Sequence, residues 1–209
     1  MGGLGLALGL WLLGSSTAVE VERVLALVNG VPILASDVEL AQIAGIVPKM
    51  PQEDEASYRK AVLEALIALE LRYQDLVEAR LEQRVSYDWQ AAWQRVVTQA
   101  GGEEELSRKL AEQGFSQGEL VRLVQRAALV EAYVAKWFAP SLRVTQGELE
   151  AYYRQEFLPR WPAGQGPPPP LEQVRPQLEA LVKEKKLLQQ VQTWTQELAR
   201  RGEVIRYSR

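Results

Sequence analysis

Hydrophobic residues recur every three to four positions through most of the chain, which is the spacing of amphipathic helices. The clearest case runs from Ser57 to about Arg84, where one stripe consists of Tyr58, Val62, Leu66, Leu69, Tyr73 and Leu76. A second stripe of Leu63, Ile67 and Leu71 widens the apolar face. We therefore predict a central helix here that packs against neighbours on two sides.

The same spacing predicts helices over 36–46, 86–100, 116–138, 145–157 and 171–201, with a short helix around Leu106 and Leu110. The candidate N-caps are Ser36 or Asp37, Ser57, Ser86, Ser116 and Thr145, and Glu148 completes a capping box with Thr145. The residues expected to end helices are Gly101, Gly114, Pro140 and Gly202. The last helix carries an apolar stripe of Val174, Leu178, Leu181, Leu188, Val191 and Leu198.

Two short segments have the composition of strands. Residues 24–28 and 31–34 are apolar and flank Asn29-Gly30, the residue pair that suits a two-residue hairpin turn. Pro32 lacks an amide donor, so its strand should lie at a sheet edge. Because a lone hairpin is marginal in water, it needs a partner, and the best candidate is 204–207 at the other end of the chain. The pattern predicts a mainly α fold with a small β-sheet that joins the N-terminal hairpin to the C-terminal strand.

The first eighteen residues differ from the rest. Leu4 to Leu13 form an apolar block too short for a stable transmembrane helix, and Ser16 and Ala18 form a small-x-small pattern before a possible cleavage site at Val19. A signal peptide normally begins with positive charge, whereas the first basic residue here is Arg23. The preferred interpretation of 1–18 is a signal peptide and a periplasmic or otherwise exported protein with no stable membrane insertion after its removal. The alternative is a buried or disordered N-terminal extension.

The composition of the chain argues against several classes of function. The chain is 47% hydrophobic and 24% charged, and its formal net charge of −3 gives no reason to expect nucleic acid. It contains neither Cys nor His, which excludes the common nucleophile–base pairs and the commonest metal ligand. Lys183, Lys185 and Lys186 could meet an anionic surface, although a solvated helix face is the preferred interpretation. No catalytic residue, cofactor or metal is expected.

Aromatic residues are the unusual feature of the helical part. The candidate peptide-binding residues are Tyr73, Trp89, Trp93, Trp137, Tyr152, Tyr153, Trp161 and Trp194. Core packing explains any one of them, whereas a groove that holds apolar segments of a partner would leave some rings partly exposed.

The order of these segments resembles the SurA-like periplasmic chaperones. The matching features are VNGVPIL at 28–34 before a capped helix, VTQGELEAYYRQ at 144–155, and the final LEQVRPQLEALVKEKKLLQQ helix at 171–190 with its terminal strand. The resemblance implies a helical chaperone domain over 19–157, completed by the C-terminal helix and strand of 171–209. Between them lies 158–170, a loop with six prolines, where the family usually carries a parvulin-type prolyl isomerase domain.

That loop is far too short for a domain, and the family's isomerase centre uses His, which this chain lacks. The resemblance therefore implies an ATP-independent holdase that binds unfolded or partly folded exported polypeptides, notably outer-membrane proteins, without catalysis. Two alternatives remain open: a structural or adaptor subunit that grips one envelope partner, and, less favoured, a peptidyl-prolyl isomerase. A homodimer that exchanges its end elements also remains open.

Overall fold

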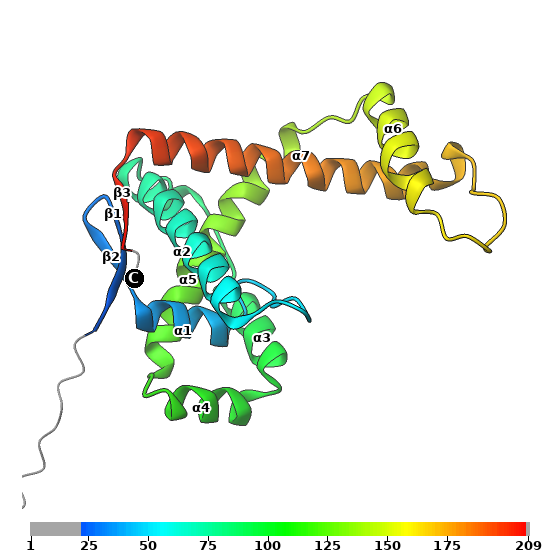
Figure 1. Cartoon of the computed structure of the whole chain (residues 1–209). Coiled ribbons are helices and arrows are strands. Elements are labelled where there is room, and N and C mark those ends of the chain that lie inside the picture. The colour runs from blue at the N-terminus through cyan, green and yellow to red at the C-terminus, as the bar shows by residue number, and fades with distance from the viewer. Residues whose placement is uncertain (1–21, 208–209) are drawn as a thin grey trace, which may run out of the picture.

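The computed structural model describes residues 22–207, and within them it is mainly helical with a small three-stranded sheet (Figure 1). This confirms the expected fold class, including the union of the N-terminal hairpin with the C-terminal strand. The predicted signal peptide, residues 1–18, lies outside the described residues. Among the helices that the structure describes, none has the length and hydropathy needed to cross a membrane.

The sheet consists of β1 (Val24–Val28), β2 (Val31–Leu34) and β3 (Val204–Arg206), antiparallel in the order β2-β1-β3. Asn29 and Gly30 have φ angles of 49° and 82°, so they form the tight hairpin turn that their sequence predicts. Because β1 is central, the proline-containing strand β2 lies at an edge, as expected.

Asn29 also fastens the C-terminal end of the chain to this turn. Its Oδ1 accepts a hydrogen bond from the Glu203 backbone N–H at 2.7 Å, and its Nδ2 donates to Gln74 Oε1 at 2.8 Å. A Cβ on Gly202 would lie 2.5 Å from Asn29 Oδ1. Gly202 ends the last helix as predicted, but its φ of −97° is not left-handed. The reason for glycine here is this close approach and not the conformation of a C-terminal cap.

The helices are α1 (Ala35–Ala44), α2 (Glu55–Glu78), α3 (Trp89–Ala100), α4 (Glu103–Glu112), α5 (Gln117–Trp137), α6 (Gln146–Tyr152) and α7 (Leu171–Arg201). Short 3-10 turns occupy Glu82–Arg84, Ala139–Ser141 and Leu158–Arg160, and a π turn follows α6 over Tyr153–Phe157. The limits of α7 match the prediction. Helix α2 ends six residues earlier than the expected Arg84, because the chain turns at Arg80, whose φ is 53°, and continues as a 3-10 turn.

The expected capping box of Thr145 and Glu148 is present, and Ser116 is the predicted cap of α5. The structure adds a second capping box there, because Glu119 pairs with Ser116. Two other caps are corrections: Asp54 replaces Ser57, and Asp88 replaces Ser86. In both cases a nearby aspartate accepts a backbone N–H, from Ser57 and Ala91 respectively. The carboxylate carries full negative charge at the positive end of the helix dipole, which favours it over the serine hydroxyl.

The start of α1 is a third correction. Leu34, and neither Ser36 nor Asp37, is the cap residue. The Asp37 carboxylate acts from inside the first turn, where Oδ2 accepts the Leu34 N–H at 2.8 Å. Burial raises the pKa of Asp37, and the hydrogen bond from Leu34 partly offsets that rise.

Helix α2 is the central helix of the molecule, as its two apolar stripes predict. It packs against α1, α5, α7 and the sheet, and it contributes to two of the apolar clusters. Leu76 of α2 and Leu120 of α5 are completely buried. A third cluster, built around Trp93 and Leu106, fills the space between α3, α4, α5 and α1. We call residues 22–138 together with 190–207 the body.

Helix α7 extends beyond the body and carries a second, smaller unit, which we call the arm, residues 145–182 (Figure 1). In the arm α6 packs on α7, and Leu149, Leu178 and Val182 are buried there. Leu178 is buried in the arm and Leu198 in the body core, and they are twenty residues apart, which is about five and a half helical turns. The arm and the body therefore use nearly opposite faces of one helix, joined by residues 183–189, which we call the bridge.

Candidate peptide-binding surface

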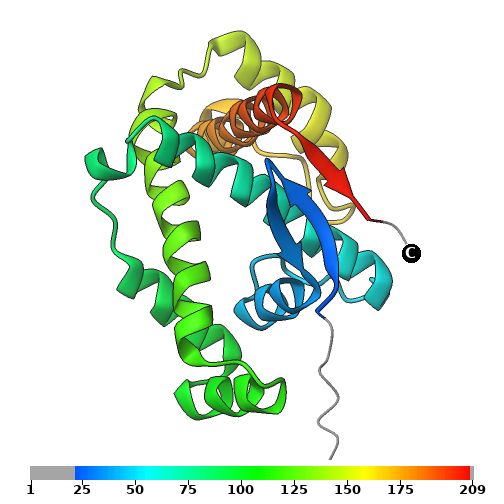
Figure 2. The same ribbon diagram turned by 90° about the vertical axis from the view of Figure 1, so that its left-hand side faces the viewer.

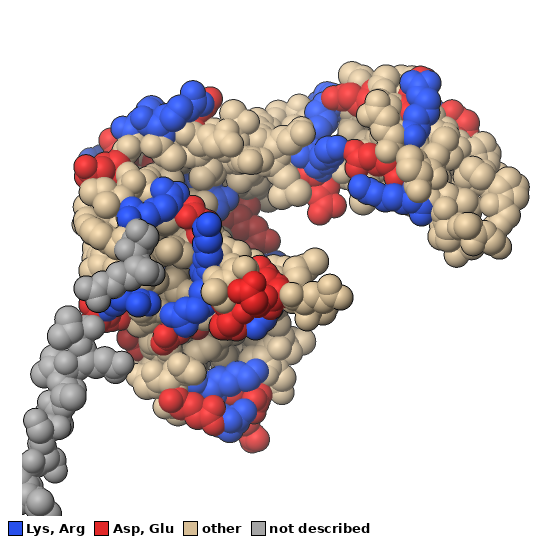
Figure 3. Space-filling model, viewed as in Figure 1, with Lys and Arg blue, Asp and Glu red and all other residues tan. Residues whose placement is uncertain are grey.

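An open hollow lies beneath α7, between the body and the arm. Figure 3 shows this hollow in space-filling form, with the bridge above it, the body on one side and the arm on the other. The loop of residues 47–54 projects from the body on the same side (Figure 1), and its Met50 is 64% exposed. The molecule thus combines an open hollow with an exposed apolar residue in a loop that projects on the same side.

Two leucines of α7 are exposed, which the sequence did not predict. Leu188 is 64% exposed and Leu181 is 44% exposed, although both belong to the apolar stripe expected to pack. They are seven residues apart and share one side of the helix. That side lies between the arm-facing and body-facing sides, so neither unit covers it. Their exposure depends on where the two units attach, which no local pattern reveals.

Trp137 and Trp194 belong to one aromatic cluster where α5 reaches α7, and Tyr133 links them. The Tyr133 ring stacks on Trp137 at 5.0 Å between centroids and lies 5.5 Å from Trp194, which has Phe138 edge-on at 5.3 Å. Trp194 Nε1 donates to Asp75 Oδ2 at 3.0 Å, and Trp194 is half-buried. Trp137 is 38% exposed, with Lys136 Nζ 4.5 Å above its ring. The structure therefore joins two predicted site residues and leaves one of them accessible.

The other predicted aromatics of the body are more enclosed. Trp93 is buried, and Trp89 packs against the same apolar cluster, so both contribute to the interior between α3 and α5. Tyr73 packs in the cluster that contains Trp194, and the Arg126 guanidinium lies 4.8 Å from its ring centre.

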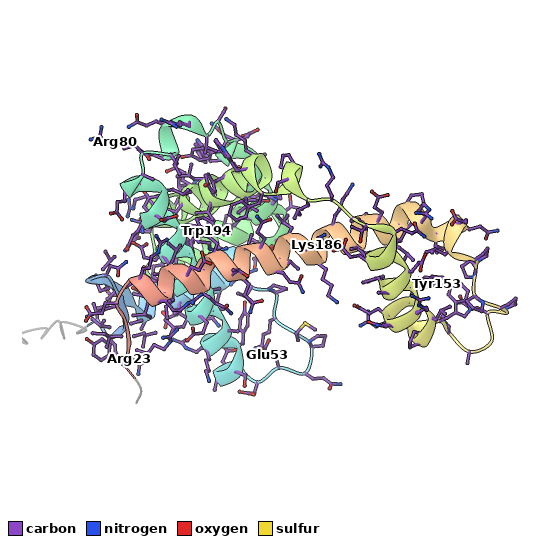
Figure 4. The ribbon with its side chains drawn as sticks, turned by 90° about the horizontal axis from the view of Figure 1, so that it is seen from above. Arg23, Glu53, Arg80, Tyr153, Lys186 and Trp194 are labelled. Carbon is purple, nitrogen blue, oxygen red and sulfur yellow. The ribbon has the colours of Figure 1, made fainter. Side chains whose placement is uncertain are left out.

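Tyr152, Tyr153 and Trp161 lie in the arm, far from Trp194 along α7 (Figure 4). Tyr153 stacks on Phe157 at 5.5 Å, and Phe157 lies 5.6 Å from Trp161. Tyr153 Oη donates to the Pro169 carbonyl at 2.8 Å, and Trp161 Nε1 donates to the Gly166 carbonyl at 3.0 Å. Tyr153 therefore ties the proline-rich loop to the turn that follows α6, and Trp161, itself a loop residue, bonds within that loop. The eight predicted residues do not form one groove.

The three lysines of α7 each pair with a glutamate. Lys183 contacts Glu179 at 3.2 Å, Lys185 pairs with Glu156, and Lys186 pairs with Glu148 at 2.6 Å. Hydrogen bonds from Lys186 and from Thr145 lower the pKa of Glu148 to about 2. Lys186 Nζ also donates to the Arg143 carbonyl at 2.6 Å, so it ties both α6 and the preceding link to the bridge. These contacts fit a solvated helix face that holds the arm in place.

Among the described residues, a partly open pocket of about 280 Å³ lies in the body between β2, α1, α2 and α5. Leu40, Leu66, Leu69, Phe115 and Leu123 form its apolar walls. Glu70 lines it as well and is 9% exposed, with Arg126 at 3.1 Å and Gln74 at 2.8 Å. Ligand sites usually begin near ~300 Å³, and the polar groups here already pair with one another. In the part of the chain that the structure describes, no acidic cluster is spaced to hold a metal ion.

Neither a known family model nor a curated protein matches this chain.

Proposed function

We propose that this protein is an ATP-independent holdase of the SurA-like type, which binds unfolded or partly folded exported polypeptides in the hollow between body and arm. The observation that carries the proposal is the placement of the body and the arm on opposite faces of α7, which leaves an open hollow between them, together with exposed apolar side chains on α7 and on the 47–54 loop. A catalytic site is normally a defined pocket with convergent polar groups. An open surface with scattered apolar contacts is better suited to many different chains.

The exposed side chains are suited to weak binding at several points. Trp137, Leu181, Leu188 and Met50 come from three separate segments, so an extended client can contact them in different combinations. Full burial of one such side chain contributes about 1.5–3 kcal/mol, and binding opposes that gain with the entropy of ordering the client. Such a balance holds a client long enough to hinder aggregation and releases it without nucleotide hydrolysis.

The arm supports a holdase and not an isomerase. The segment between the end of the π turn and α7 is a short loop, tied to Tyr153 through Pro169 and closed internally by Trp161, and it occupies the position at which SurA-like chaperones usually carry an isomerase domain. The isomerase centre of that family uses His, and this chain contains no His. We propose that the arm's task is to form one wall of the hollow.

The test is suppression of aggregation of an unfolded outer-membrane protein by the purified protein, with a prolyl-peptide isomerisation assay on the same preparation. Leu181→Gln with Leu188→Gln should weaken suppression, because it removes exposed apolar contacts and keeps good helix formers. The matched control is Gln190→Ala with Gln192→Ala, two exposed polar positions on the same helix. Suppression across unrelated clients without isomerisation supports the proposal. Tight binding to one envelope protein, without general suppression, would favour the adaptor instead, and measurable isomerisation would contradict the proposal.

A further inference from the structure

The two edges of the sheet differ in what their backbones offer to another strand. In a two-residue hairpin the residues next to the turn, Val28 and Val31, pair with each other by hydrogen bonds. The backbone groups of Pro32 and Leu34 then point away from β1. Pro32 has no N–H, and the Leu34 N–H is held by Asp37 at 2.8 Å. The edge formed by β2 therefore has no free donor with which to accept a new strand.

The edge formed by β3 is open among the described residues. The Asn29 N–H donates to the Glu203 carbonyl at 2.8 Å, and the Tyr207 N–H donates to the Leu25 carbonyl at 2.9 Å. Because the direction of these bonds alternates along a strand, Ile205 also faces β1, while the backbone groups of Val204 and Arg206 point outward. No described residue hydrogen-bonds to either outward N–H or carbonyl. In Figure 2, β3 forms the outer edge of the sheet.

Side chains around β3 fit an extended segment of varied sequence. Ile205 and Tyr207 are 37% and 49% exposed, and they offer apolar surface on one side of the edge. Arg206 points the other way and pairs with Glu64 through two contacts of 2.8 Å, so its charge is neutralised within the body. The edge therefore presents backbone donors and acceptors with apolar flanks and no unpaired charge from Arg206. These groups match the backbone of an extended chain and not a particular sequence.

We propose that β3 is a strand-addition site, at which an extended segment with alternating apolar residues pairs with the outward groups of Val204 and Arg206. The identity of that segment as part of a client rests on the proposed function. The short length of β3 limits pairing to these two residues, so binding is weak and reversible. Its flanking Ile205 and Tyr207 select segments with β-branched or aromatic side chains, because these favour pleated pairs.

The first measurement is amide hydrogen exchange by NMR on the unmodified protein. The probe is a blocked peptide of about ten residues, the upper end of common strand lengths, in which Val and Thr alternate. The control peptide has a proline at its centre. The alternating peptide should slow exchange at the Val204 and Arg206 amides and leave Tyr207, which already faces β1, unchanged. This measurement requires no variant, so it remains decisive if a substitution detaches β3.

The second measurement compares Arg206→Pro with Arg206→Ala. Both remove the pair with Glu64, but only proline removes the outward N–H and places a ring where a strand would lie. Arg206→Pro should weaken peptide binding at least about fivefold, the effect of losing roughly one hydrogen bond, while Arg206→Ala should change it less than about twofold. Equal effects of the two variants would overturn strand addition.

The remaining outcomes separate this inference from the proposed function. Suppression of client aggregation without slowed exchange at Val204 and Arg206 would overturn strand addition and leave the holdase proposal standing. Slowed exchange at these amides without suppression of aggregation would support strand addition and contradict the holdase proposal. Protection already present without peptide would also overturn the inference: if it grows with protein concentration, a second copy occupies the edge, and if it does not, the chain itself covers it.

Discussion

The body and the arm are stabilised in different ways, although one helix belongs to both. The body buries large apolar side chains in three clusters that join helices and strands from both ends of the chain. The arm buries a single small group, Leu149, Leu178 and Val182. Its other contacts include the adjoining rings of Tyr153, Phe157 and Trp161, ion pairs along α7, and the hydrogen bonds of Tyr153 and Trp161 to loop carbonyls.

This difference predicts that the arm opens independently of the body. Local opening costs least where few apolar groups are buried and many contacts are polar and exposed. The body supplies a stable platform, and the arm supplies a wall of the hollow that can open at lower cost. For a holdase of varied clients, such a division lets the binding surface change its width while the sheet and its β3 edge remain intact.

The largest expected effect compares two buried leucines. Leu120→Ala in the body should reduce the free energy of unfolding of the whole molecule by about 2–5 kcal/mol, through lost burial and a residual cavity. Leu178→Ala in the arm, equally buried, should instead raise hydrogen exchange only in α6 and the first half of α7. Urea denaturation and hydrogen exchange distinguish the two. If Leu178→Ala lowers protection in the sheet as much as in the arm, the two units are one cooperative structure.

The next effect compares two glycines. Gly202→Ala should destabilise by about 1–3 kcal/mol, because its Cβ would overlap Asn29 Oδ1 and push β3 away from the hairpin turn. Gly147→Ala is the matched control in α6, where no atom lies within 4 Å of the added Cβ. It should stabilise the arm by about 0.5–1 kcal/mol, since alanine is the better helix former. Thermal unfolding would measure both, and a neutral Gly202→Ala would show that the Asn29 contact is easily relaxed.

A third prediction concerns the pH dependence of the arm. The pKa of Glu148 is lowered from 4.5 to about 2 by Lys186 and Thr145. A carboxyl with a lowered pKa stabilises the folded state at pH values above 4.5, and that stabilisation is lost as the pH falls toward 2. NMR signals of the arm should therefore weaken over this interval before those of the sheet. Glu148→Gln should remove this part of the dependence, and an unchanged acid profile in that variant would contradict the assignment.

The smallest effect is expected at an ion pair on the body surface. Arg95 and Glu131 join α3 and α5 with a 2.8 Å contact, but both side chains are well exposed. Solvent and salt screen such a pair, so Arg95→Ala should change the free energy of unfolding by less than about 1 kcal/mol. Urea denaturation at low and high salt would check this value. A larger loss of unfolding free energy would mean that polar contacts stabilise the body as much as they stabilise the arm.

Several features of this fold follow from short segments of sequence alone. Asn29-Gly30 forms the tight turn because both residues tolerate positive φ. Ser116 and Thr145 begin helices because each has a glutamate three residues later. The full length of α7 also follows from its periodicity. Each of these signals acts between residues within one or two turns, so the surrounding structure hardly changes it.

Other features depended on contacts between distant segments. The sequence could not separate the buried Trp93 from the accessible Trp137, because aromatic character is the same in both and only the neighbouring helices decide exposure. Leu181 and Leu188 belong to an apolar stripe, yet arm and body pack on other sides of α7 and leave them uncovered. Gly202 is required by a side chain 173 positions away, counted from Asn29 to Gly202. The sequence by itself determined the elements and their order. Tertiary packing alone decided which surfaces remain open, because coverage is a property of the neighbours that the fold brings together.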